Sequence, residues 1–103
     1  MDIRQLNALV AVVDTGSFSA AAQSLHTVQS NISTHIARLE QELSVSLIDR
    51  RTGVLTEEGA LVVERARRVQ TELESISLDV KALHTEVSGI VRLGVIGTTG
   101  RWV

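Results

Sequence analysis

The side chains with the clearest chemical character lie in one short stretch, residues 27–43. Apolar residues recur there at the spacing of one helical face: Val28, Ile32, Ile36, Leu39 and Leu43. The opposite face carries amides, hydroxyls and one imidazole: Gln29, Ser30, Asn31, Ser33, Thr34 and His35. A plain solvated helix face would carry more Glu and Lys. Amides and hydroxyls can bind base edges in a DNA major groove, and the front of this helix has no carboxylate to repel phosphate. The stretch therefore predicts a recognition helix.

Two helices ahead of this stretch are predicted to hold it in place. The first covers residues 2–14, with Asp2 suited to its N-terminal cap and Gly16 able to end it in a left-handed conformation. The second is short, residues 18–25, and either Ser17 or Ser19 can cap it. Its inward-facing residues are expected to be Phe18, Ala21, Ala22 and Leu25. Its run of alanines at 20–22 permits a close helix crossing, and Thr27 is the expected cap of the helix that follows. A short turn between two such helices predicts a helix-turn-helix.

A β-hairpin wing is expected after the recognition helix. A polar tip, residues 49–53, is flanked by apolar residues, which predicts two short strands around a turn. The flanking residues are Val45 and Leu47 or Ile48 on one side and Val54 and Leu55 on the other. The tip carries the adjacent Arg50 and Arg51, which could reach a phosphate or the minor groove, although a solvated turn is the simpler alternative.

A long helix is predicted to start after Thr56, which can cap it, and to run to about Val87. Its apolar residues follow alternating steps of four and three, which is a coiled-coil seam. The seam residues are Val62, Ala66, Val69, Leu73, Ile76, Val80, Leu83 and Val87. We expect a second copy of the helix to cover this seam in a homodimer; packing against a further domain is the alternative.

Composition limits the remaining possibilities. The 103 residues contain no cysteine, and the three histidines are scattered, so we expect no metal site and no enzyme active site. No apolar run approaches the ~20 residues of a membrane span, which favours a cytoplasmic protein. The net charge of −2 does not by itself indicate a nucleic-acid partner. Residues 88–103 change to a strand-like and Gly-rich pattern, which is interpreted as the start of a truncated domain.

The sequence resembles the N-terminal part of a LysR-type transcriptional regulator. The matching residues include the 16–22 run Gly-Ser-Phe-Ser-Ala-Ala-Ala, the pairs Gln29-Ser30 and Leu39-Glu40, and the 55–59 run Leu-Thr-Glu-Glu-Gly. The resemblance covers essentially the whole chain. It implies a mainly α fold, in which a three-helix winged helix-turn-helix head with a β-hairpin wing precedes a long dimerisation helix. The expected divisions are a DNA-binding domain at 1–58, a linker helix at 59–87 and the start of an effector-binding domain at 88–103.

The expected function is sequence-specific binding of double-stranded DNA by a homodimer, at an interrupted inverted repeat. The candidate DNA-binding residues are Thr27, Gln29, Ser30, Asn31, Ser33, Thr34, Arg38, Arg50 and Arg51. The resemblance also implies a tetramer in the full-length protein, contact with RNA polymerase, and a small-molecule effector that needs the complete C-terminal domain; no cofactor is expected in this chain. The alternative hypothesis is a dimerisation module that does not bind DNA and sequesters a full-length regulator.

Overall fold

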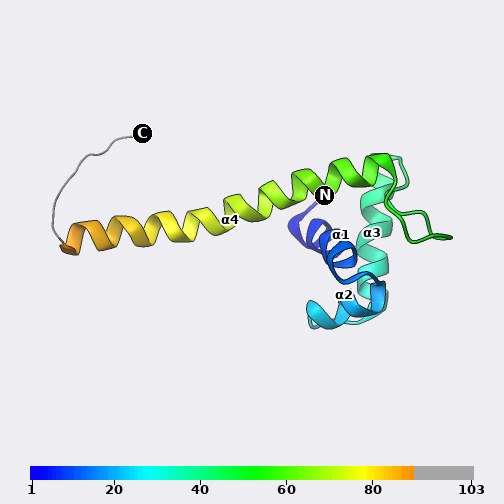
Figure 1. Cartoon of the computed structure of the whole chain (residues 1–103), viewed down its shortest axis with the longest axis horizontal. Helices are drawn as coiled ribbons and strands as arrows, with labels where there is room; N and C mark the ends of the chain where they lie inside the picture. The colour runs from blue at the N-terminus through cyan, green and yellow to red at the C-terminus, as the bar shows by residue number, and fades with distance from the viewer. Residues whose placement is uncertain (90–103) are drawn as a thin grey trace. The chain divides into compact units, whose positions relative to one another are not determined.

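The computed structural model describes the backbone of residues 1–89 and the side chains of residues 1–84. It contains four helices in this range: α1 (Ile3–Thr15), α2 (Phe18–Ser24), α3 (Gln29–Leu43) and α4 (Glu57–Gly89) (Figure 1). The chain divides into two compact units, with the boundary after Val69. The predicted strand that begins at Ile90 lies outside the described residues, as does the side chain of Val87.

The helix ends follow the local chemistry of the sequence. The Asp2 carboxylate accepts a hydrogen bond from the backbone N–H of Gln5 at 3.1 Å and caps α1, as predicted. Gly16 ends α1 with a φ of 91°, a left-handed conformation that costs glycine little. Of the two candidate caps for α2, Ser17 is the one used, because its Oγ accepts from the N–H of Ala20 at 3.0 Å.

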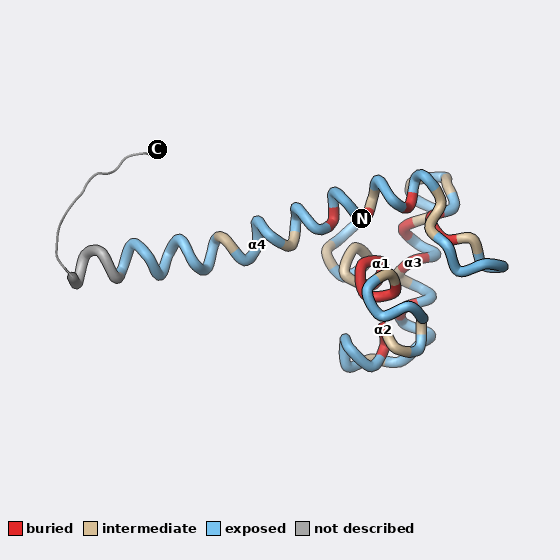
Figure 2. The backbone as a smooth tube through the Cα atoms, in the orientation of Figure 1, coloured by how far each residue is buried: buried red, intermediate tan, exposed pale blue. Residues whose placement is uncertain are grey.

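Residues 1–69 form the head, and their aliphatic core is formed by all four helices and by the wing (Figure 2). Its buried residues are Ala8, Leu9, Val10, Ala11, Val12, Ala21, Ala22, Ile32, Ile36, Leu39, Leu47, Ile48, Val63 and Ala66. The two buried alanines of α2 confirm the predicted close packing, because α2 contacts both α1 and α3. The burial of three α3 side chains on one face leaves the polar face of that helix outside.

Two residues that were predicted to face inward are exposed. Leu25 is 40% exposed and Val28 is 59% exposed. Leu25 is the C-terminal cap of α2 and Val28 is the N-terminal cap of α3, so both lie in the turn between these helices. A residue in a turn does not follow the periodicity of either helix, which is why the spacing argument fails for both.

The predicted wing is present in a reduced form. The described residues contain no strand, only an isolated antiparallel bridge between Ile48 and Leu55. Asp49 N–H donates to the Val54 carbonyl at 2.9 Å, and Thr56 N–H donates to the Leu47 carbonyl at 3.0 Å. The prediction of two strands was wrong because the segment is too short: a turn closes it at one end and α4 begins at Glu57 at the other.

The residues of the predicted dimer seam fall into two groups: the first ones pack in the core of the head, and the later ones are exposed. Ala66 is 1% exposed and packs in the core of the head, together with the partly buried Val62. The structure thus corrects the assignment of Ala66 to the dimer interface, because a side chain already enclosed within one chain cannot contact a second. The apolar residues further along α4 are exposed, beginning with Val69 at 39% and Leu73 at 51%.

The start of α4 is fixed to the wing by Thr56 and Gly59. The Thr56 Oγ1 donates to the Ser46 carbonyl at 2.6 Å and accepts from the Gly59 N–H at 2.9 Å, so it is the N-terminal cap that the sequence predicted. A Cβ added at Gly59 would lie 2.0 Å from the Leu47 carbonyl oxygen. Only glycine therefore allows the first turn of α4 to approach the wing backbone this closely.

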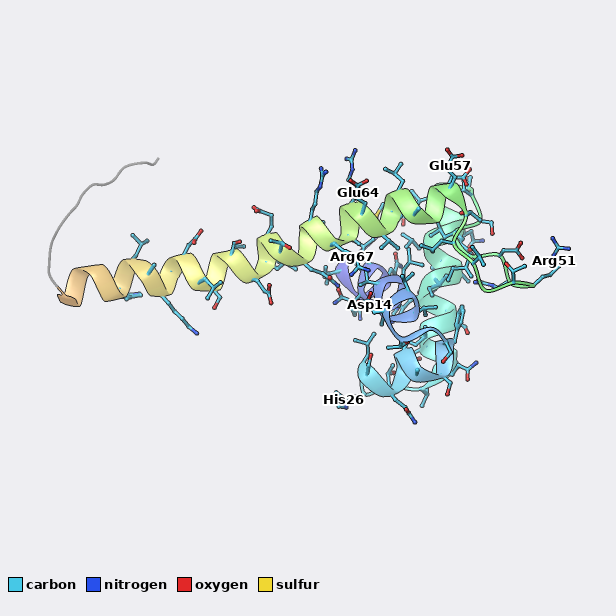
Figure 3. The ribbon with its side chains drawn as sticks, in the orientation of Figure 1. Asp14, His26, Arg51, Glu57, Glu64 and Arg67 are labelled. Carbon is cyan, nitrogen blue, oxygen red and sulfur yellow. The ribbon has the colours of Figure 1, made fainter. Side chains whose placement is uncertain are left out.

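An ion pair joins α4 to the end of α1 (Figure 3). The Arg67 guanidinium donates to the Asp14 carboxylate, with Nη2–Oδ1 at 2.8 Å and Nη1–Oδ2 at 3.3 Å. This hydrogen bonding lowers the pKa of Asp14 below its ordinary value of 3.8, against a smaller opposing effect of desolvation. Both side chains are about half exposed, so solvent screening keeps the contribution of the pair to stability small.

We expect Gly59→Ala to destabilise the head by about 1–3 kcal/mol, because the new methyl group forces the wing and α4 apart. In an open helix the same change would stabilise by roughly 1 kcal/mol. Urea unfolding followed by circular dichroism measures the difference, with Ala60→Gly as the neighbouring control for helix propensity. A stabilising Gly59→Ala would contradict the close approach.

We expect Asp14→Asn to lower the unfolding temperature at pH 7. The folded-state pKa of Asp14 is depressed, so its carboxylate stabilises the head above the unfolded-state pKa, and this contribution is lost as pH falls through the folded-state pKa. The variant and the wild type should therefore converge in acid. Thermal unfolding across pH tests this, and a difference that persists at the lowest pH would argue against the ion pair as its cause.

Candidate nucleic-acid interface

The polar face of α3 is open to solvent. Its exposed residues are Gln29, Ser30, Asn31, Ser33 and Thr34, and His35 is partly buried. Ile32 and Ile36, both 0% exposed, fix the rotation of the helix about its own axis by packing into the core. The surface offers amide and hydroxyl groups, which can each donate and accept hydrogen bonds. Such groups on one side of an exposed helix can bind the edges of bases.

The beginning of α3 differs from the prediction. Thr27 does not cap the helix; Val28 occupies the cap position and makes no side-chain hydrogen bond there. The Thr27 N–H is used to close the preceding turn, since it donates to the Ala22 carbonyl at 2.9 Å. Its Oγ1 accepts from the Asn31 side-chain amide at 2.7 Å. Thr27 thus orients Asn31, one of the predicted base-contacting residues.

The two arginines of the wing lie in different surroundings. Arg51 is 90% exposed, approaches Asp49 only to 3.8 Å, and points away from the helices at the tip of the wing (Figure 3). The Arg50 side chain is 49% exposed, and its Nη2 donates to Glu40 Oε1 at 3.0 Å. The Arg50 guanidinium carbon also lies 5.3 Å from the centre of the Phe18 ring, within the range of a cation–π interaction.

Glu40 is a residue whose importance the sequence analysis missed. Its side chain is only 17% exposed, and Oε2 accepts hydrogen bonds from two backbone N–H groups, Leu47 at 2.7 Å and Ile48 at 3.3 Å. Glu40 therefore connects the last turns of α3 to the base of the wing. One sequence signal was available: a carboxylate near the C-terminus of a helix opposes the helix dipole, so its presence there suggests a specific partner.

Most acidic side chains of the head are neutralised by ion pairs with nearby basic groups. Residues 1–69 contain seven arginines and eight acidic residues. Six of these acids form ion pairs, including Glu42 with the amino group of Met1; the two others, Glu57 and Glu58, lie in the first turn of α4. Arg38 is exposed on α3 and has no ion-pair partner among residues 1–84. The polar side of α3 thus carries an uncompensated positive charge.

Among residues 70–84 of α4, a line of apolar side chains is exposed to solvent. Its members at the predicted seam positions are Leu73, Ile76, Val80 and Leu83, with exposures between 48% and 62%. Leu78 is equally exposed at 64%, but it is five residues after Leu73 and falls on the opposite side of the helix.

A metal site and a membrane-spanning helix each have requirements that the described residues do not meet. They contain no group of three His, Cys, Asp or Glu side chains placed to hold a metal ion. Within the same part of the chain, no helix combines the length and the apolar character needed to cross a membrane.

Comparisons with known proteins agree on one family. Residues 3–60 match the family described as bacterial regulatory helix-turn-helix protein, lysR family. The chain is 44% identical over 95 residues to an uncharacterized HTH-type transcriptional regulator of Azotobacter vinelandii, covering 90% of this chain and 66% of that protein. It is 38% identical over 91 residues to the HTH-type transcriptional regulator CrgA of Neisseria meningitidis, covering 86% of this chain and 30% of that protein.

The fold is also found in solved structures. The chain resembles the DNA-binding domain of BenM in its complex with catB site 1 DNA, with a TM-score of 0.76 and 30% identity. The match covers 82% of this chain and 94% of that domain. It bears out the predicted winged helix-turn-helix architecture with its long helix, even though the wing here has a single bridge. The chain spans about a third of the length of CrgA.

Proposed function

The chain belongs to the LysR family of bacterial helix-turn-helix regulators, and on that premise we propose that it binds double-stranded DNA and regulates transcription. The observation that carries the proposal is the exposed, acid-free face of α3 from Gln29 to Thr34. An α-helix fits the major groove, where each base pair presents a distinct pattern of donors and acceptors. The similarity to a domain crystallised on DNA supports the same use of this surface.

We assign base reading to the amides and hydroxyls at the start of α3. Gln29 can form two hydrogen bonds with adenine, at N6 and N7, and Ser33 lies one turn further along the same face. Ser30 and Asn31 complete the base-reading set. Thr34, Arg38 and Arg51 are suited to phosphate or the minor groove, because they are exposed and carry no negative charge.

We propose that two chains bind together through the exposed apolar line of α4. Leu73, Ile76, Val80 and Leu83 recur at coiled-coil spacing and are about half exposed or more in the single chain. A homodimer would present two α3 helices to major grooves one helical turn or a multiple apart, roughly 34 Å per turn. The expected operator is an interrupted inverted repeat. From family membership we also propose, for a chain of the length of CrgA, a tetramer, a small-molecule effector and contact with RNA polymerase.

The test of DNA binding is a selection from random duplexes, followed by binding measurements with the selected site and with random DNA. The wild-type chain should prefer the selected site. Gln29→Ala should weaken binding to it by roughly 1–3 kcal/mol and relax the preference at one base pair, while binding to random DNA changes little.

Gln41→Ala is the matched control, because Gln41 is an exposed glutamine near the other end of α3 and should leave the base preference intact. A wild-type chain that dimerises but binds no duplex, even at low salt, would instead support a sequestering module. Equal loss on selected and random DNA in Gln29→Ala would show that Gln29 does not read bases.

The dimer is tested by placing a charge on each side of α4. Leu73→Glu should convert the dimer to a monomer, because it buries an unpaired carboxylate in the apolar seam. Leu78→Glu should remain dimeric, because Leu78 is as exposed as Leu73 but lies on the opposite side of the helix. Sedimentation equilibrium measures both. Dissociation by Leu78→Glu alone, or by neither change, would contradict the assigned interface.

A further inference from the structure

Arg50 and Glu40 form a cluster whose role differs from direct contact with DNA. We propose that Arg50 is a positioning residue: it acts through Glu40 to hold the wing against α3, and Arg51 is the arginine of the wing that contacts DNA. The inference rests on the proposed DNA-binding function and deepens it. It revises the expectation that both adjacent arginines bind phosphate or the minor groove.

Both oxygens of the Glu40 carboxylate accept hydrogen bonds from residues 47–50. One oxygen, Oε2, accepts from the N–H groups of Leu47 and Ile48 at 2.7 and 3.3 Å. The other oxygen, Oε1, accepts from Arg50 Nη2 at 3.0 Å. A single carboxylate therefore holds both the base of the wing and the first arginine of its tip, and each of its oxygens has a partner.

Arg50 contacts two side chains of the helix-turn-helix. Its guanidinium lies over the Phe18 ring at 5.3 Å while it pairs with Glu40. Phe18 begins α2 and Glu40 lies in α3, so Arg50 connects the wing to both helices of the helix-turn-helix. A planar guanidinium suits this place because it can stack on a ring and form a directed ion pair at once. Arg50 would have to give up these contacts to reach outward.

Arg50 also balances the charge of Glu40. The Glu40 side chain is 17% exposed, and a carboxylate that is largely withdrawn from water needs compensation. Arg50 supplies it, which also cancels a negative charge on the helix that is proposed to enter the groove. Arg51 has no comparable partner: it is 90% exposed, and its distance to Asp49 is 3.8 Å. The two arginines are therefore adjacent in sequence but unequal in their freedom to bind DNA.

The salt dependence of DNA binding separates a side chain that binds phosphate from one that positions the wing. Removing one phosphate-binding side chain should reduce the slope of log K against log salt by about 0.9. In the full chain, with the duplex that the wild type selects, Arg51→Gln should reduce the slope by about this amount per bound chain. Arg50→Gln should lower affinity at every salt concentration and leave the slope unchanged.

A double-mutant cycle with Glu40→Gln supplies the second readout. If Arg50 acts through Glu40, Arg50→Gln should weaken DNA binding severalfold in the wild-type background and have little further effect in Glu40→Gln. The effect of Arg51→Gln should be the same in both backgrounds, because Arg51 does not contact Glu40. Arg50→Lys serves as the conservative variant and should restore part of the affinity by keeping the ion pair.

The outcomes are distinct. A reduced slope for Arg50→Gln, or equal effects of Arg50→Gln in both backgrounds, would overturn the positioning role and return Arg50 to the DNA-contacting set. An unchanged slope for Arg51→Gln would overturn the other half of the assignment. Failure of the wild-type chain to bind any duplex would instead refute the proposed function.

Thermal unfolding of the wild type, the two single variants Arg50→Gln and Glu40→Gln, and the double variant measures the contact without DNA. The two changes should be coupled in their effect on the unfolding temperature, and independent effects would contradict the contact itself.

Discussion

The burial of Ile32, Ile36 and Leu39 is the constraint on which the rest of the head depends. These side chains are 0% exposed, and they anchor one face of α3 against α1 and α2. Once that face is fixed, the polar residues of α3 have no place to lie except at the surface. The arrangement needs small residues on α2, and Ala21 and Ala22 meet that need. Packing in the core thus decides which side chains are available for binding.

Much of this architecture could be predicted from the sequence, because it follows from local chemistry. The Asp2, Ser17 and Thr56 caps and the left-handed Gly16 depend on residues within a few positions of one another. The apolar spacing of α3 was equally informative. The exceptions are Leu25, Val28 and the expected Thr27 cap, all in the turn between α2 and α3, where helical periodicity carries no information.

The parts of the site that could not be predicted depend on contacts between distant elements. Glu40 reaches backbone groups seven and eight residues further along the chain, and Arg50 meets the ring of Phe18. No pattern in the sequence records these distances. The close approach of Gly59 to the Leu47 carbonyl is similar, because a glycine at the start of a helix is otherwise only a weak helix former.

The division of α4 between core and surface has a genetic consequence. Ala66 belongs to the core of the head, whereas Leu73 and the apolar residues after it remain exposed. Under the proposed dimer, a bulky substitution at the buried Ala66 that unfolds the chain behaves as a recessive loss. A change confined to the polar face of α3 leaves the chain able to pair with an intact copy and to disable it. Alleles of the second kind would be dominant, although they alter the protein far less.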